Sequence, residues 1–106
     1  MALTITTNVA NGVAKITLDG ELDASVSGKF KDAVEAVAQQ KPGRLVIFLD
    51  KLTFMASAGL RILIFAKQKM GADVGIYAIG AQGPVLSTLK MSGFDRSIYL
   101  KDAYVD

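Results

Sequence analysis

The chain has 106 residues, of which 51% are hydrophobic and 21% are charged, as expected of one globular domain over residues 1–106. It contains no cysteine and no histidine, which excludes disulfide frameworks, zinc sites built on these residues, and Ser-His-Asp or Cys-His catalytic groups. Its 12 basic and 10 acidic residues leave a formal charge of only +2, which does not indicate a nucleic-acid partner.

The sequence predicts no targeting or membrane segment. Residues 1–7 lack a cationic stretch followed by an apolar one. The apolar runs are far shorter than the roughly 20 residues that cross a membrane. We therefore expect a soluble, cytoplasmic protein.

Two short runs at the start of the chain predict a β-hairpin. Residues 3–8 and 12–18 have the composition of β-strands, and the second run alternates polar and apolar side chains. An Asn-Gly pair lies in the connecting residues 8–12, and such pairs are typical of tight hairpin turns. The first two strands are expected to pair antiparallel.

An amphipathic helix is predicted next, over about residues 24–40. Apolar residues recur there at spacings of three and four, and charged residues lie off that stripe. Asp23, Ser25 and Ser27 are candidate N-caps, and a Pro-Gly pair at residues 42–43 ends the helix.

The middle of the chain alternates apolar strands with helices. Residues 45–49 form a continuous apolar run, typical of a central strand covered on both faces, and residues 74–79 form another. Helices are predicted over residues 57–70 and 84–91. Apolar residues surround much of the first of these helices, which is expected to be largely buried.

The end of the chain completes the predicted fold. A last edge strand is expected near residues 97–100, and one or two helical turns at residues 101–105. Helical segments of crossover length between apolar strands predict parallel pairing with right-handed connections. The fold class is therefore α/β, a four- to five-stranded mixed sheet with an N-terminal hairpin and about four α-helices packed on it.

One segment has features beyond those of a scaffold. Residues 50–56 are expected to form the longest loop at the carboxyl end of the sheet, where functional groups collect in open α/β sheets. Ser57 follows at the start of a helix. Its hydroxyl is interpreted either as an N-cap or as a phosphorylation site, since backbone N–H groups and the helix dipole favour an anion there.

Three short motifs occur in an order typical of one protein family. The run Leu-Thr-Phe-Met-Ala-Ser-Ala-Gly-Leu at residues 52–60 resembles a phosphorylation motif in which Asp-Ser-(Ser/Ala)-Gly-hydrophobic opens the second helix. Gly-Glu-Leu-Asp at residues 20–23 is similar to a Gly-x-Leu-Asp run, and residues 89–95 resemble a closing Leu-x-x-x-Gly-hydrophobic-Asp segment. With these motifs and its element order, the chain resembles a single STAS domain of the bacterial anti-sigma factor antagonists, the SpoIIAA-like proteins.

The resemblance implies a STAS-type fold and a regulatory protein with neither catalytic activity nor a cofactor. In such proteins an anti-sigma factor that is also a serine kinase phosphorylates the serine matching Ser57, and a PP2C-type phosphatase removes the phosphate. The unphosphorylated form binds the kinase, frees a sigma factor and so regulates transcription. The implied partner-binding residues are Asp23, Met55, Ala56, Ser57, Ala58, Gly59, Leu60 and Arg61.

Four of these positions carry further expectations. Asp23 is interpreted as a helix cap or, by resemblance, as a contact to the kinase. Phe54 and Met55 are candidate apolar anchors for a partner, with core packing favoured for Phe54. Ala56 stands where the family commonly has aspartate, which removes a negative charge beside any phosphate and bears on kinase recognition.

The sequence also admits other functions. A glycine-rich turn at residues 80–84 suggests a small-ligand or nucleotide-binding module outside phosphorylation control, although the Walker and dinucleotide patterns are absent. A serine enzyme would use Ser57 with Lys51 as its base, which requires desolvation of the lysine. The cations of the second helix, Arg61 among them, are interpreted as a solvated face or as a rim that steers an acidic partner.

Overall fold

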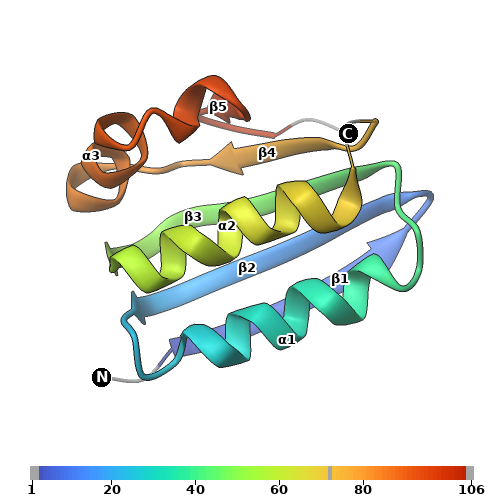
Figure 1. Ribbon diagram of the computed structural model, residues 1–106, viewed down its shortest axis with the longest axis horizontal. Coiled ribbons are helices and arrows are strands. Elements are labelled where there is room, and N and C mark those ends of the chain that lie inside the picture. Colours follow the sequence, from blue (N-terminus) through green and yellow to red (C-terminus); the bar gives the residue numbers. More distant parts are fainter. Residues whose placement is uncertain (1–2, 72, 105–106) are drawn as a thin grey trace.

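The computed structural model describes residues 3–71 and 73–104, which form a five-stranded sheet with helices against it (Figure 1). Only β1 and β2 pair antiparallel, and the other neighbours pair parallel. The mixed sheet, its N-terminal hairpin and its central strand β3 confirm the predicted α/β class. In spatial order the strands are β1 (Leu3–Ala10), β2 (Val13–Leu22), β3 (Arg44–Met55), β4 (Gly75–Ile79) and β5 (Tyr99–Lys101).

The crossover helices lie on one face of the sheet. Helix α1 (Ser27–Ala38) joins β2 to β3, and α2 (Ser57–Met70) joins β3 to β4. Both crossovers step the same way across the sheet, so right-handed connections place both helices on the same face. Figure 1 shows α1 and α2 side by side in front of the sheet. A third helix, α3 (Gly83–Met91), and a 3-10 turn, η1 (Phe94–Arg96), lead into β5.

The hydrophobic core lies between this face and the helices. Alternate residues point into it and are buried over Ala14–Leu18 of β2, Leu45–Leu49 of β3 and Ile76–Ala78 of β4, as the alternation of strand side chains requires. Burial of each large side chain stabilises the fold by about 1.5–3 kcal/mol. The largest contributors are Ile16, Leu18, Leu45, Ile47 and Leu49 from the strands and Phe30, Val34 and Leu63 from the helices.

The turn between β1 and β2 has the conformation that its sequence predicts. Asn11 and Gly12 both have positive φ, at 54° and 76°. A type I′ turn requires this at both central positions, and its twist matches that of the flanking strands.

The prediction of a long loop at residues 50–56 is wrong, because strand β3 continues to Met55. Leu52 and Met55 are buried and pair with Gly20 and Leu22 of β2. The β2–β3 register shifts twice along this stretch, as in a β-bulge. The second half of β3 is hard to recognise in the sequence because exposed polar residues interrupt its apolar pattern.

Three predictions about helices also need correction. Residues 101–104 form the end of β5 and irregular structure instead of a helical turn, and residue 105 lies outside the described residues. The described residues therefore contain three α-helices and η1, not about four α-helices. Helix α2 is not largely buried, since only Gly59, Leu63 and Ala66 are fully covered.

The opposite face of the sheet carries an aromatic cluster around the end of the chain. Its members, called here the Tyr104 cluster, alternate along the strands with core residues. The Arg44 Nη1 group donates a hydrogen bond of 2.9 Å to the Tyr104 hydroxyl. The Tyr104 ring meets two aromatic rings edge-on, with centroid distances of 6.4 and 5.8 Å, and the Lys15 Nζ atom lies 5.5 Å from its centroid. The cluster consists of Lys15, Arg44, Phe48, Tyr77 and Tyr104.

Candidate functional site

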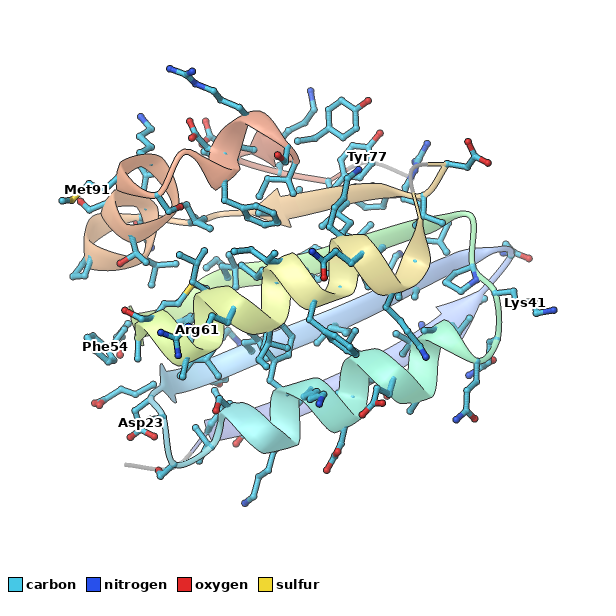
Figure 2. The ribbon with its side chains drawn as sticks, viewed as in Figure 1. Asp23, Lys41, Phe54, Arg61, Tyr77 and Met91 are labelled. Carbon is cyan, nitrogen blue, oxygen red and sulfur yellow. The ribbon has the colours of Figure 1, made fainter. Side chains whose placement is uncertain are left out.

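The candidate site lies where β2 and β3 end and α2 begins. The backbone N–H of Ala56 donates a hydrogen bond of 2.9 Å to the Leu22 carbonyl, which joins the two strand ends. A second link runs from the Thr53 hydroxyl to the Gly20 carbonyl at 3.0 Å. These links fix the loop that follows β2 beside the start of α2. Figure 2 shows Asp23, Phe54 and Arg61 at this one end of the molecule.

Ser57 is the first residue of α2 and does not cap it. The N-cap is Ala56, whose backbone is extended and whose side chain makes no cap hydrogen bond. The N-cap interpretation of Ser57 is therefore wrong. The serine is exposed, and its hydroxyl has no hydrogen-bond partner within residues 3–71 and 73–104. A free hydroxyl at the surface is available to a modifying enzyme.

The burial of Phe54 and Met55 reverses the expectation. Met55 is only 2% exposed and belongs to the core, whereas Phe54 is 43% exposed. The two neighbours point to opposite sides because strand residues alternate. Phe54 is therefore exposed at the surface, and Met55 is buried beneath it in the core.

Gly59 is buried beneath the start of α2. A Cβ atom at this position would lie 2.6 Å from Leu22 Cδ2 and 2.7 Å from Leu22 Cγ. Side-chain atoms do not approach so closely, so only glycine lets the helix pack on the end of β2 at this distance. Gly59 therefore supports the site from below. Of the other predicted contact residues, Ala56, Ala58 and Leu60 are half-buried, and Arg61 is exposed.

Asp23 organises the loop between β2 and α1. Its Oδ1 atom accepts hydrogen bonds from the Ser25 backbone N–H at 2.9 Å and from the Ser25 hydroxyl at 2.6 Å. This is an Asx-type turn. Helix α1 begins later, at Ser27, and its N-cap is Val26, so none of the three predicted caps holds that position. Hydrogen bonds lower the pKa of Asp23 and keep the carboxylate charged. The largest contribution comes from the Ser25 hydroxyl, and the backbone N–H groups contribute less.

The helix that begins at Ser57 contributes cationic and apolar side chains to the surface. Helix α2 carries Arg61, Lys67 and Lys69 and has no acidic residue. Two further exposed apolar side chains accompany Phe54, namely Ile64 at 37% and Met91 at 88%. Sequence reasoning missed both. Ile64 lies seven residues after Ser57, on the same helix face, so its spacing was an available signal. The sequence contains no comparable signal for the exposure of Met91, which lies at the end of α3.

The alternative sites receive no support from the geometry. Lys51 is exposed, so the desolvated surroundings that a Ser-Lys pair requires are absent from the described part of the chain around it. In the glycine-rich turn, the Gly80 N–H already donates to the Lys101 carbonyl at 2.9 Å. The Gln82 side chain donates to the Asp50 carbonyl at 3.4 Å. These bonds tie the turn, which leads from β4 into α3, to the end of β5 and to β3.

The described residues contain neither a metal-ligand cluster nor a membrane-spanning helix. Within residues 3–71 and 73–104, no group of three or more acidic, cysteine or histidine side chains is arranged to hold a metal ion. None of the helices in this part of the chain is long and apolar enough to span a bilayer.

The chain is similar in sequence and structure to known proteins. The family model described as "STAS domain" matches residues 4–106. The anti-sigma-F factor antagonist RsfB of Mycobacterium tuberculosis is 28% identical over 99 residues, covering 93% of this chain and 81% of RsfB. A crystal structure of an anti-sigma factor antagonist from Mycobacterium paratuberculosis superimposes with a TM-score of 0.88 at 28% identity, covering 96% of this chain and 87% of that one.

A more distant likeness concerns the fold alone. The unphosphorylated form of the anti-sigma factor antagonist SpoIIAA gives a TM-score of 0.74 at 18% identity, over 97% of this chain and 90% of that one. The phosphorylated form of Bacillus SpoIIAA gives 0.73 at 19% identity, over 97% and 92%. The same fold therefore exists with and without a phosphate.

Proposed function

The chain belongs to the STAS domain family, and we propose that it is an anti-sigma factor antagonist whose binding is switched by phosphorylation of Ser57. Its likeness to RsfB over most of both chains supports the antagonist function. The exposed, unpartnered hydroxyl of Ser57 is the observation that carries the switch. The proposed role is regulatory and not catalytic, and we expect the protein to act in the cytoplasm.

In the unphosphorylated state, the proposed surface binds an anti-sigma factor. The aromatic ring of Phe54 supplies an apolar contact beside Ser57, and Arg61 supplies a charge on the next turn of α2. Half-buried Ala58 and Leu60 complete the surface, and Asp23 borders it from the adjoining loop. Occupation of the anti-sigma factor by this surface releases a sigma factor for transcription.

Phosphorylation reverses this state. In the proposed reaction, a serine kinase carried by the anti-sigma factor transfers the γ-phosphoryl group of ATP to Ser57 Oγ. The new O–P bond replaces the bond from the γ-phosphorus to the bridging oxygen, ADP leaves, and the hydroxyl proton is released. The phosphate adds a charge of about −1.5 to −2 in the middle of the docking surface, which repels or displaces the partner. A PP2C-type phosphatase would restore the hydroxyl by hydrolysis.

The residue before Ser57 sets a condition on the kinase. Because Ala56 carries no carboxylate, a kinase that recognises this protein cannot depend on a negative charge at that position. We expect a cognate kinase to contact Phe54 or Arg61 instead, since both are large exposed side chains within four residues of Ser57.

The test is phosphorylation by anti-sigma factors that carry a serine kinase domain and are encoded in the same genome. Each kinase is incubated with ATP and the protein, and the modified residue is mapped by mass spectrometry. We expect one phosphate on Ser57 and none in Ser57→Ala. Ser87→Ala removes another exposed serine hydroxyl and serves as the matched control that remains a substrate. Modification of Ser57→Ala at the rate of the wild type would refute the assignment.

Binding measurements test the consequence of that modification. Isothermal titration of the same anti-sigma factor should give at least about tenfold weaker affinity for the phosphorylated protein and for Ser57→Asp, which corresponds to about 1.4 kcal/mol. Ser57→Ala should bind as tightly as the unmodified wild type. Equal affinities for all forms would contradict the switch.

A further inference from the structure

Helix α2 has an unusual distribution of charge. Its 14 residues include three cations and no acid, and its first turn lacks the acidic residue that commonly offsets the helix dipole. Ser57 is the only hydroxyl-bearing residue of this helix. A negative charge added to Ser57 would therefore be the first within α2.

Ser57 and Arg61 are neighbours on the solvent face of the helix. They are four residues apart, so their Cβ atoms lie about 5–6 Å from one another. Both are exposed. Lys67 and Lys69 lie two to three turns further along and do not share this position.

Arg61 has no competing partner in the described part of the chain. No ion pair, hydrogen bond or ring contact involves its guanidinium within residues 3–71 and 73–104. Asp23 in the adjoining loop makes no ion pair with it among the described residues, and the Oδ1 atom of Asp23 accepts from Ser25. Ala56 supplies no carboxylate immediately before Ser57. The guanidinium is therefore available for a phosphate one turn away.

We propose that Arg61 is the internal partner of phosphorylated Ser57, which deepens the proposed function and rests on it. The planar guanidinium donates two N–H groups to two phosphate oxygens, a geometry that arginine offers and lysine does not. This pairing removes Arg61 from the surface that meets the anti-sigma factor while the phosphate adds negative charge. One modification thus changes two contacts of the docking surface.

The pairing has two measurable consequences. An arginine beside the phosphate favours its dianion, so the second pKa of phosphoserine falls. A negative group at the first turn of α2 and an ion pair at spacing four both stabilise the helix, so phosphorylation should raise the melting temperature by a few degrees. Both effects should weaken as salt is added.

The test uses the full chain with phosphoserine encoded at position 57, so it needs neither a kinase nor a partner. A titration followed by 31P NMR measures the phosphate pKa in the wild type, Arg61→Gln and Lys67→Gln. We expect Arg61→Gln to raise this pKa by about 0.3 unit and to remove the part of the gain in melting temperature that comes from the ion pair. Lys67→Gln removes the same charge further along the helix and should leave the pKa nearly unchanged.

Either of two results would overturn the proposal. The first is a phosphate pKa in Arg61→Gln equal to that of the wild type, and the second is an equal shift in both variants, which would mean that only net charge matters. Neither result bears on whether Ser57 is phosphorylated in the cell. Conversely, a shift confined to Arg61→Gln establishes the pair even if no anti-sigma factor binds the protein.

Discussion

The Ser57 end of the molecule and the Tyr104 cluster both carry an arginine and aromatic side chains or a single aromatic ring, but they differ in whether the arginine and the hydroxyl group have partners. Tyr104 receives a hydrogen bond from Arg44 and packs against two rings from neighbouring strands. At the other region Ser57 and Arg61 have no partner among the described residues, and Phe54 is 43% exposed. The comparison separates side chains whose contacts stabilise the fold from side chains left available to another molecule.

The Ser57 end itself contains both exposed side chains and buried side chains that support them. The exposed residues stand on a buried layer formed by Leu22, Met55 and Gly59, all within the core. Changes in this layer should alter stability, and changes above it should alter binding. The predictions below test this division.

The largest effect is expected at the buried layer, from Gly59→Ala. The added methyl group would overlap Leu22, which is fully buried and has little room to move. Overpacking of this kind costs about 1–3 kcal/mol, partly offset by the better helix propensity of alanine. We expect the free energy of unfolding in urea to fall by about 1–2 kcal/mol.

Gly28→Ala in α1 is the matched control for that change. Nothing lies within 4 Å of a Cβ at Gly28, and this glycine also lies in the first turn of a helix. It should therefore show an unchanged or slightly higher stability. Equal destabilisation by the two substitutions would mean that helix packing at Gly59 is not close.

The second prediction concerns the exposed layer, where Phe54→Ala should weaken binding without unfolding the protein. Truncation of an exposed aromatic anchor typically costs about 1–2 kcal/mol of binding free energy, or about tenfold in affinity. The loss of stability should be small because the ring is 43% exposed. Isothermal titration with the anti-sigma factor and urea unfolding measure the two effects.

Tyr99→Ala provides the corresponding change away from the site. Tyr99 is 55% exposed and stacks on Tyr77 at a centroid distance of 4.7 Å, on the opposite face of the sheet. Its loss should leave affinity for the anti-sigma factor unchanged. A similar loss of affinity in both variants would show that the partner covers far more of the molecule than the Ser57 end.

The same division explains what could be read from the sequence. The approximate positions of the strands, the β1–β2 hairpin and the bounds of α2 follow from local signals such as Asn11-Gly12, and the motif around Ser57 pointed to the correct family. These features depend on neighbouring residues. The extension of β3 to Met55 depends instead on pairing with β2 some thirty residues earlier, which no local pattern reveals.

Side-chain exposure at the site was harder to predict for a similar reason. Whether Phe54 or Met55 points outward depends on the strand register, and a one-residue uncertainty exchanges the two faces. The exposure of Met91 depends on how α3 packs against the rest of the protein, which the local periodicity of the sequence does not determine. The N-caps predicted at Ser57 and Asp23 were misplaced by one and three residues, because the ends of helices are the features least determined by local sequence.

A smaller effect is expected within the Tyr104 cluster, from Tyr104→Phe. The variant keeps the ring contacts and removes the hydroxyl that accepts from Arg44. Loss of one such hydrogen bond costs about 0.5–1.5 kcal/mol of unfolding free energy. Tyr99→Phe, at an exposed ring with no hydrogen bond among the described residues, should change little. Affinity for the anti-sigma factor should be the same in both, and a loss confined to Tyr104→Phe would extend the binding surface to this face.

The smallest effect concerns Asp23 and its dependence on pH. Hydrogen bonds, first of all from the Ser25 hydroxyl, hold the pKa of this carboxyl below its ordinary value of 3.8 in the folded protein. The charged form therefore stabilises the fold at pH values above that ordinary value, and this contribution is lost as the pH falls below it through the folded pKa. Ser25→Ala should raise the Asp23 pKa toward 3.8 and shrink that dependence.

NMR titration of the Asp23 carboxyl carbon measures this shift directly. Ser27→Ala is the control, because the Ser27 hydroxyl donates to the Ala24 carbonyl and not to Asp23. If the Asp23 pKa moves equally in both variants, the loop responds as a whole and the Ser25 bond has no special part. If it moves only in Ser25→Ala, the Asp23 carboxylate that borders the Ser57 surface is held by its own turn. Asp23 would then have both roles that the two regions separate. Its Oδ1 atom stabilises the loop, and its negative charge remains at the surface for an incoming partner.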